Sequence, residues 1–232
     1  PERNNGNFLI CNCIGFLGVL QHEVRYNGAD ITAHEVDPIL VSSDPNFRPT
    51  DIEVGGDGAL YVSDWCNVLI GHMQHNMRDP NRDHAHGRIY RVTYKGRPLL
   101  DPVKLKGKPV VDVLQAFYAA ENGVRYRARL ELSGRQRDHV ATEVGRWAAG
   151  LDPADPADAQ ALLECLWVLE EQRVVNLDLL KTVFQAEEPR VRAAAIRTLG
   201  HWGTRVKEGE DILVSAARDT AALVRAEAVK AA

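Results

Sequence analysis

The sequence predicts a protein of two parts, one built of strands and the other of helices. Up to about Leu100, short apolar runs are separated by glycine and asparagine turns, as in antiparallel sheets. From Pro109 onward, alanine, leucine, arginine and glutamate recur at helical spacing, and a short pattern repeats. The chain of 232 residues is long enough for two modest domains that each bury a core. We expect a strand domain at 1–98, a linker at 99–108 and a helical domain at 109–232.

Composition excludes several classes of function. A net charge of −4 and an isoelectric point near 6.1 give no general basic field, so nucleic acid is not an expected partner. No apolar run approaches the roughly 20 residues that span a bilayer. The four cysteines match no zinc-site spacing and no haem-attachment motif, which leaves them as small apolar residues for a core. Because the chain starts at Pro1 and enters directly into an apolar run, we expect an internal fragment of a longer protein.

The first part contains six or seven expected strands in two unequal groups. A glycine-rich hairpin turn at 55–58 separates two of them. Antiparallel strands of this size are typical of a sandwich or of propeller blades, and the number is too small for a closed propeller. The expected strands are Asn7–Phe16, Gly18–Tyr26, Ile31–Ser43, Phe47–Val54, a strand that ends at Asp64, and Gly87–Thr93.

A polar loop between the last two strands is the candidate functional site. Long loops held between rigid strands often carry function. Histidine pairs at His72-x-x-His75 and His84-x-His86 offer imidazole ligands to a metal, and the alternative is a network in which they bond carbonyls and carboxylates. The candidate residues are Asp64, His72, His75, Arg78, Asp79, Asp83, His84, His86 and Arg88.

Two further patterns lie in this loop. The spacing Asp79-x-Asn81-x-Asp83 resembles the start of a calcium loop, but His84 replaces the required glycine and Tyr90 the required glutamate. Arginines alternate with the aspartates, which predicts a latch in which Arg78 or Arg82 pairs with Asp79, Asp83 or a neighbouring acid. Trp65 is expected in the core, and Met73 and Met77 beneath the loop.

The second part carries an internal repeat. Val124-Arg125-x-x-Ala128, Val191-Arg192-x-x-Ala195 and Val224-Arg225-x-x-Ala228 share one pattern, and the first gap is about twice the second. A degenerate copy at Ala161 fills the missing place, and an apolar or small residue follows each alanine by four positions: Leu132, Cys165, Leu199 and Ala232. This spacing puts both residues on one helix face. We expect about four helical hairpins of the HEAT type, the last one truncated. Arg125, Arg127 and Arg129 are expected on a solvated face.

The stretch from Phe47 to Asn67 (FRPTDIEVGGDGALYVSDWCN), followed by LIGHMQHNMRDPNRDHAHGRIYRVT, resembles the propeller end of a known family. The family is that of the membrane-bound dehydrogenases also called PVC-type haem-binding CxxCH proteins, whose propeller is similar to glucose and sorbosone dehydrogenases. The resemblance continues through GLDPADP and LLECLWVLE, so it covers nearly the whole chain. The chain departs from the family in lacking the cytochrome-like domain and its haem motif.

The resemblance implies the last blades of a β-propeller followed by a HEAT-like α-solenoid. It implies an exported or periplasmic, membrane-associated parent protein whose propeller oxidises a sugar or alcohol and passes electrons to a cytochrome c domain. Haem c is then expected in that missing domain and not in this chain, with calcium or a quinone in the propeller. The expected partners are the rest of the propeller and the cytochrome domain. The alternative function is a non-catalytic scaffold that binds protein or glycan on its helical surface.

Overall fold

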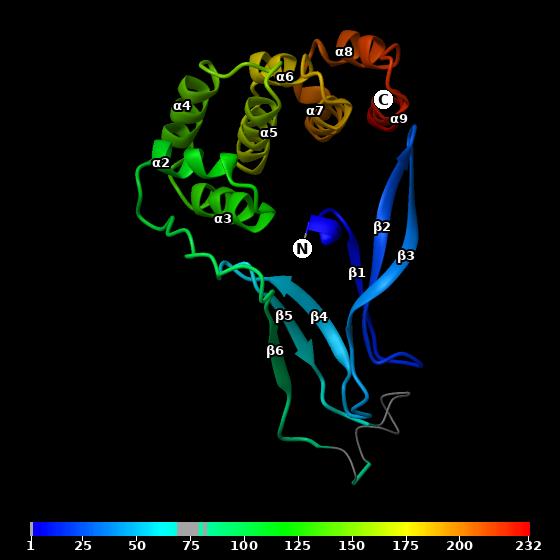
Figure 1. The fold of residues 1–232 in the computed structure, drawn as a ribbon. Coiled ribbons are helices and arrows are strands. Elements are labelled where there is room, and N and C mark those ends of the chain that lie inside the picture. The colour runs from blue at the N-terminus through cyan, green and yellow to red at the C-terminus, as the bar shows by residue number, and fades with distance from the viewer. Residues whose placement is uncertain (1, 69–78, 81–82) are drawn as a thin grey trace. The chain divides into compact units, whose positions relative to one another are not determined.

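The computed structural model describes residues 2–68, 79–80 and 83–232 (Figure 1), and its chain divides into two compact units. The first unit contains the strands and the second contains the helices. The first comprises Pro1–Asn27 and Ile31–Pro102, and the second comprises Gly28–Asp30 and Val103–Ala232. No helix of the described ranges combines the length and apolar character that a membrane crossing requires.

The strands form two antiparallel sheets. The first sheet has the order β1-β2-β3, and the second has the order β4-β5-β6. Both hold three strands in the described part of the chain, so the expected division into unequal groups is wrong, whereas the expected strands are confirmed. These residues form no closed propeller. The strands are β1 (Phe8–Asn12), β2 (Gly18–Asn27), β3 (Asp30–Val41), β4 (Pro49–Val54), β5 (Leu60–Asp64) and β6 (Arg88–Val92), preceded by a short 3-10 helix η1 (Glu2–Asn4).

A small apolar core holds the first unit together. Val19, Phe47 and Val62 are fully or almost fully buried, and partly buried aliphatic residues of both sheets pack against them. Val62 of β5 lies opposite Ile52 of β4 and Tyr90 of β6, which fixes the register of the second sheet. The turn before β5 requires a glycine, because Gly58 has a φ of 73° that other residues rarely adopt.

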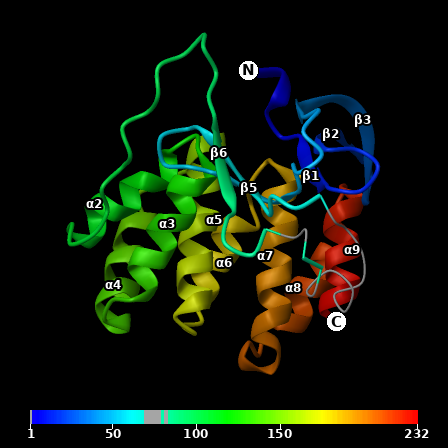
Figure 2. The same cartoon turned by 90° about the horizontal axis from the view of Figure 1, so that it is seen from below.

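The second unit is a stack of helical hairpins in two layers. Helices α3, α5, α7 and α9 form one layer, in which each helix contacts the next, and α4, α6 and α8 form the other (Figures 1 and 2). The helices are α2 (Val110–Leu114), α3 (Asn122–Ser133), α4 (Arg137–Ala148), α5 (Pro156–Glu171), α6 (Leu177–Val183), α7 (Pro189–Trp202), α8 (Gly209–Ala216) and α9 (Ala222–Ala231). Two 3-10 turns, η2 (Gln115–Tyr118) and η3 (Gly203–Arg205), complete the unit.

Local capping explains where several of these helices begin. The Asp155 carboxylate accepts hydrogen bonds from the N–H groups of Ala157 and Asp158 at the start of α5. Asn176 caps α6 in the same way through the N–H of Leu179. Each cap satisfies donors that the first turn of a helix leaves unpaired.

The repeat pattern supplies the core between the helices. All four repeat alanines are buried, at Ala128, Ala161, Ala195 and Ala228, and these small side chains allow the helices of one layer to approach closely. Of the residues four positions later, Leu132, Cys165 and Leu199 are buried, and Ala232 is exposed. The predicted helix faces are therefore confirmed for the first three repeats.

Candidate functional site

Asp64 is the central residue of the predicted loop site. It ends β5, and its side chain has 0% relative exposure. One carboxylate oxygen accepts hydrogen bonds from the N–H groups of Arg48 at 2.7 Å and Cys66 at 2.8 Å. The other accepts from Arg88 Nε at 2.7 Å. The structure thus joins two predicted site residues, Asp64 and Arg88, in one satisfied ion pair.

Arg88 extends this ion pair to a second carboxylate. Its Nη1 donates to Asp44 at 2.8 Å, and its guanidinium lies 5.6 Å from the centre of the Tyr90 ring. The N–H of Asn46 and the guanidinium of Arg88 lower the pKa of Asp44, and the bond to Asp44, followed by Asp64, raises the pKa of Arg88. Asp44 is not predictable as a site residue from the sequence, because a carboxylate before a Pro-Asn turn indicates only a local turn.

Asp83 and His86 form a separate surface turn. One oxygen of Asp83 accepts from the N–H groups of Ala85 at 2.9 Å and His86 at 3.1 Å, and the other lies 2.9 Å from the His86 ring. The Ala85 N–H first, and His86 next, lower the pKa of Asp83. The prediction that a histidine bonds a carboxylate is confirmed. His84 is exposed and Asp79 is partly buried.

The other loop predictions have different outcomes. His72, His75, Arg78 and Arg82 lie outside the described residues, as do Met73 and Met77. In the ranges that the structure describes, no group of three or more His, Cys, Asp or Glu side chains is placed to hold a metal. Trp65 is 45% exposed, so its expected place in the core is wrong.

The cysteines behave differently from one another. All four are free thiols, and only Cys165 is buried, within α5, where burial raises its pKa. Cys11, Cys13 and Cys66 are partly exposed, which corrects the expectation that all four are core residues. The strand unit has too small a core to bury them.

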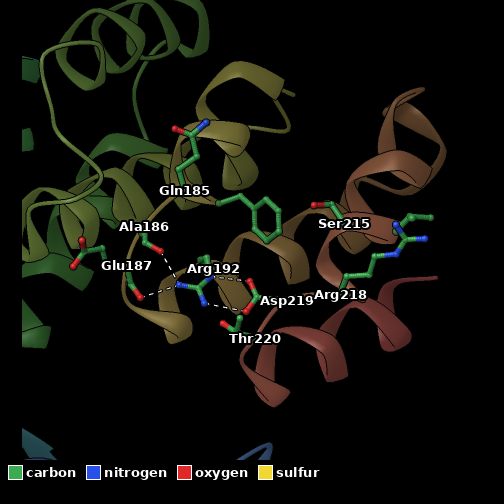
Figure 3. Close-up of a pocket in the computed structure, with 10 residues that line it drawn as sticks. Gln185, Ala186, Glu187, Arg192, Ser215, Arg218, Asp219 and Thr220 are labelled. Carbon is green, nitrogen blue, oxygen red and sulfur yellow. Dashed lines mark hydrogen bonds and ion pairs between the residues drawn. The ribbon is translucent and has the colours of Figure 1, made fainter.

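The second unit holds a hollow that the sequence did not predict (Figure 3). It has a volume of about 750 Å³ and lies between the α6–α7 and α8–α9 connections. Arg192 of α7 joins the two connections. Its Nη1 donates to the carbonyls of Ala186 and Glu187, both at 2.8 Å, and its Nε and Nη2 donate to Asp219, both at 2.9 Å. This pairing with Arg192 lowers the pKa of Asp219.

The same arginine contact recurs along the stack. Arg125 of α3 donates to the carbonyls of Ala119 and Ala120 at 2.5 and 3.1 Å, and Arg225 of α9 donates to those of Asp219 and Thr220 at 2.8 and 2.9 Å. In each case the two carbonyls come six and five residues before the arginine. We call this contact the repeat clamp. It ties the start of a helix to the connection that precedes it.

In the degenerate copy in α5, the corresponding side chain also bonds the main chain of the preceding connection, but it accepts a hydrogen bond instead of donating one. Asp158 stands in the place of the arginine and accepts a hydrogen bond from the N–H of Asp152, six residues earlier, at 2.9 Å. It also accepts from the Tyr118 hydroxyl at 2.6 Å. Burial and this hydrogen bond raise the pKa of Tyr118 to about 12.

Residues 177–232 match the family model for HEAT repeats. The match covers α6 to α9, and therefore both connections around the hollow. Residues 1–96 match a domain of unknown function, DUF7133. No curated protein and no solved structure matches the chain. Neither family model is named for a dehydrogenase or a haem protein, so the activity implied by the resemblance stays a prediction.

Buried carboxylates link neighbouring helices of the layer formed by α3, α5, α7 and α9. Glu164 of α5 is 1% exposed and accepts from Arg125 Nε at 3.1 Å and from Arg129 of α3. Glu227 of α9 pairs with Arg197 of α7 at 2.8 Å. The expectation that Arg125 and Arg129 belong to a solvated face is therefore wrong, since each neutralises a buried acid of the next repeat.

Five exposed polar side chains line the hollow: Gln185, Glu187, Ser215, Arg218 and Thr220. The guanidinium of Arg218 makes no ion pair with any residue that the structure describes (Figure 3). Phe184 and Val214 supply apolar surface in the lining. Arg192 and Asp219 are paired with each other, so they shape the hollow, and the exposed side chains of the lining are the ones available to contact a ligand.

Proposed function

We propose that the protein is a recognition scaffold whose HEAT repeats bind a segment of a partner protein in the hollow beside Arg192. The observation that carries this proposal is the hollow itself, whose walls are held by the repeat clamp. Because the two connections are fixed before binding, little conformational entropy is lost when a ligand enters. Helical repeats of this kind commonly provide extended surfaces for partners.

The lining indicates the chemistry of the partner segment. Arg218 favours a carboxylate, because it is a cation with no acidic partner among the described residues. Gln185 and Ser215 can exchange hydrogen bonds with the main chain of an extended peptide. Phe184 and Val214 favour one aliphatic or aromatic side chain. We expect a short acidic segment that carries one apolar anchor.

A displayed library of random 12-residue peptides tests the proposal on the whole chain. We expect enrichment of peptides with Asp or Glu near an apolar residue, and at least tenfold weaker binding of these peptides to Arg218→Glu. Arg137→Glu is the matched control, because Arg137 is an exposed arginine at the start of α4, away from the hollow. Absence of enrichment, or equal binding by both variants, would refute this site.

A further inference from the structure

Two successive pairs of helical hairpins in the second unit can be compared position by position. Arg192 follows Arg125 by 67 residues, and Arg225 follows Asp158 by the same interval. Each of these four side chains ties the start of its helix to the connection before it, so the interval aligns equivalent places in the structure. The hollow beside Arg192 therefore has a counterpart between the η2–α3 and α4–α5 connections.

Aromatic rings occupy that counterpart. Trp147 of α4 lies edge-on to Phe117, with 6.4 Å between the ring centres, and edge-on to Tyr118, with 5.8 Å between the centres. The Tyr118 hydroxyl is held by its hydrogen bond to Asp158. Edge-to-face ring pairs are favourable beyond the apolar area that they bury. Three packed rings thus join the two connections of the first pair.

The second pair keeps only one of these three rings. Phe184 retains the phenylalanine, but Gln185 and Val214 stand where the first pair has its tyrosine and its tryptophan. All three residues line the hollow of about 750 Å³, and Val214 is 48% exposed. Among the residues that the structure describes, no aromatic ring packs on Phe184. The hollow is therefore the place where the second pair lacks two rings beside a phenylalanine that it has kept.

We infer that the hollow takes a tryptophan side chain of the partner segment, an inference that rests on the proposed function and specifies its apolar anchor. In the first pair, an indole packs edge-on against the phenylalanine, so an indole from the partner restores the same contact on Phe184. Its N–H can donate to the Gln185 side chain or to the Ser215 hydroxyl, which both line the hollow. Arg218, which stands where the first pair has Leu151, remains for a carboxylate of the partner.

Two fluorescein-labelled acidic peptides, GDDWDDG and GDDLDDG, test the anchor on the whole chain. We expect fluorescence anisotropy to show at least tenfold tighter binding of the tryptophan peptide. Val214→Trp supplies the ring that the first pair holds at this position, so it should fill the hollow and weaken binding of the tryptophan peptide at least tenfold. Val111→Trp, at an exposed valine of α2, adds the same ring elsewhere and should leave binding unchanged.

Three outcomes would overturn the inference. These are no binding of either peptide, equal binding of both peptides, and undiminished binding of the tryptophan peptide to Val214→Trp. The proposed function is judged separately, by enrichment of acidic peptides from the displayed library and by their weaker binding to Arg218→Glu. Acidic peptides that bind as well with a leucine anchor as with tryptophan would leave the proposed function in place and refute the indole alone.

Discussion

At the scale of single residues, buried carboxylates with arginine partners recur in both units. Asp64 and Glu164 are almost completely buried, and each is neutralised by at least one arginine. Such a pair contributes little net stability over an apolar pair, but removal of one partner leaves an unpaired buried charge or unsatisfied donors. These buried acids therefore determine which arginines must pack beside them in the folded structure.

Asp64→Ala tests this at the end of β5. The substitution leaves the N–H groups of Arg48 and Cys66 and the Arg88 guanidinium without their acceptor. We expect the free energy of local unfolding to fall by about 3 kcal/mol or more. Hydrogen exchange of the β5 and β6 amides measures this change. Asp83→Ala is the comparison, and its surface turn should lose only about 1 kcal/mol. Equal losses would contradict the assignment.

Asp57 makes the first unit sensitive to acid. The Ala59 N–H first, with Arg91 and Tyr61, lowers the pKa of Asp57 to about 2. Because an unfolded aspartate has a pKa of about 3.9, the stabilisation is complete above that value and is lost as the pH falls through about 2. Asp57→Asn should remove this part of the acid sensitivity, which hydrogen exchange along a pH series measures. An unchanged pH profile would show that Asp57 has no such role.

The sequence located part of this residue-level arrangement. Asp64 and Arg88 were recognised because they stand at the ends of the strands that border the polar loop. Asp44 was not, because its partner is 44 residues away, and local turn chemistry does not indicate so distant a contact. The hollow beside Arg192 was also missed, since the helical pattern identifies buried faces and says nothing about connections.

At the scale of elements, the repeat clamp determines how each hairpin joins the next. In the first three repeats, the alanine and the residue four positions later were correctly predicted to share one helix face, because their spacing follows the helix period. The role of the arginine was not predicted, because its acceptors are main-chain carbonyls. A hydrogen bond to main-chain carbonyls requires no particular side chain in the connection, so the sequence carries no pattern that predicts it.

Arg192→Met tests the clamp while keeping an apolar stem of similar length. The substitution leaves Asp219 without its cation and the carbonyls of Ala186 and Glu187 without a donor. We expect the helical unit to lose about 2 to 3 kcal/mol of stability, measured by urea unfolding followed through far-UV circular dichroism. Arg137→Met, at an exposed arginine, should change stability by less than about 0.5 kcal/mol. Similar effects of both would refute the clamp as a stabilising contact.

At the scale of the whole molecule, the two units differ in how much core they bury. Among the described residues, the helical unit has a continuous core that runs from Leu105 to Ala228, whereas the core cluster of the strand unit has three buried apolar residues. The six strands were predicted correctly from the sequence, because the alternation of apolar and polar residues along a strand is a local property of the chain. Whether sheets close into a larger assembly depends on contacts between distant edges, which the pattern does not encode.

This contrast predicts different behaviour of the separated units. Residues 103–232 should fold alone into a monomeric helical protein with a cooperative thermal transition, because helical repeats depend on contacts between neighbours. Residues 1–102 alone should aggregate, since Phe8, Ile31 and Ile89 are more than half exposed on strands with open edges. Light scattering after size-exclusion chromatography decides both points. A monomeric, cooperatively melting strand unit would contradict the prediction.

The repeat clamp also bears on how such a protein can lengthen. Each clamp closes within six residues of its own arginine, so a duplicated hairpin brings its own clamp with it. A copied hairpin needs no compensating change in the connection that precedes it. The Asp158 variant, which reaches the main chain six residues back through an N–H instead of a carbonyl, shows that the contact survives even reversal of the side-chain charge. Tandem duplication can therefore change the number of helical hairpins without any new turn sequence between them.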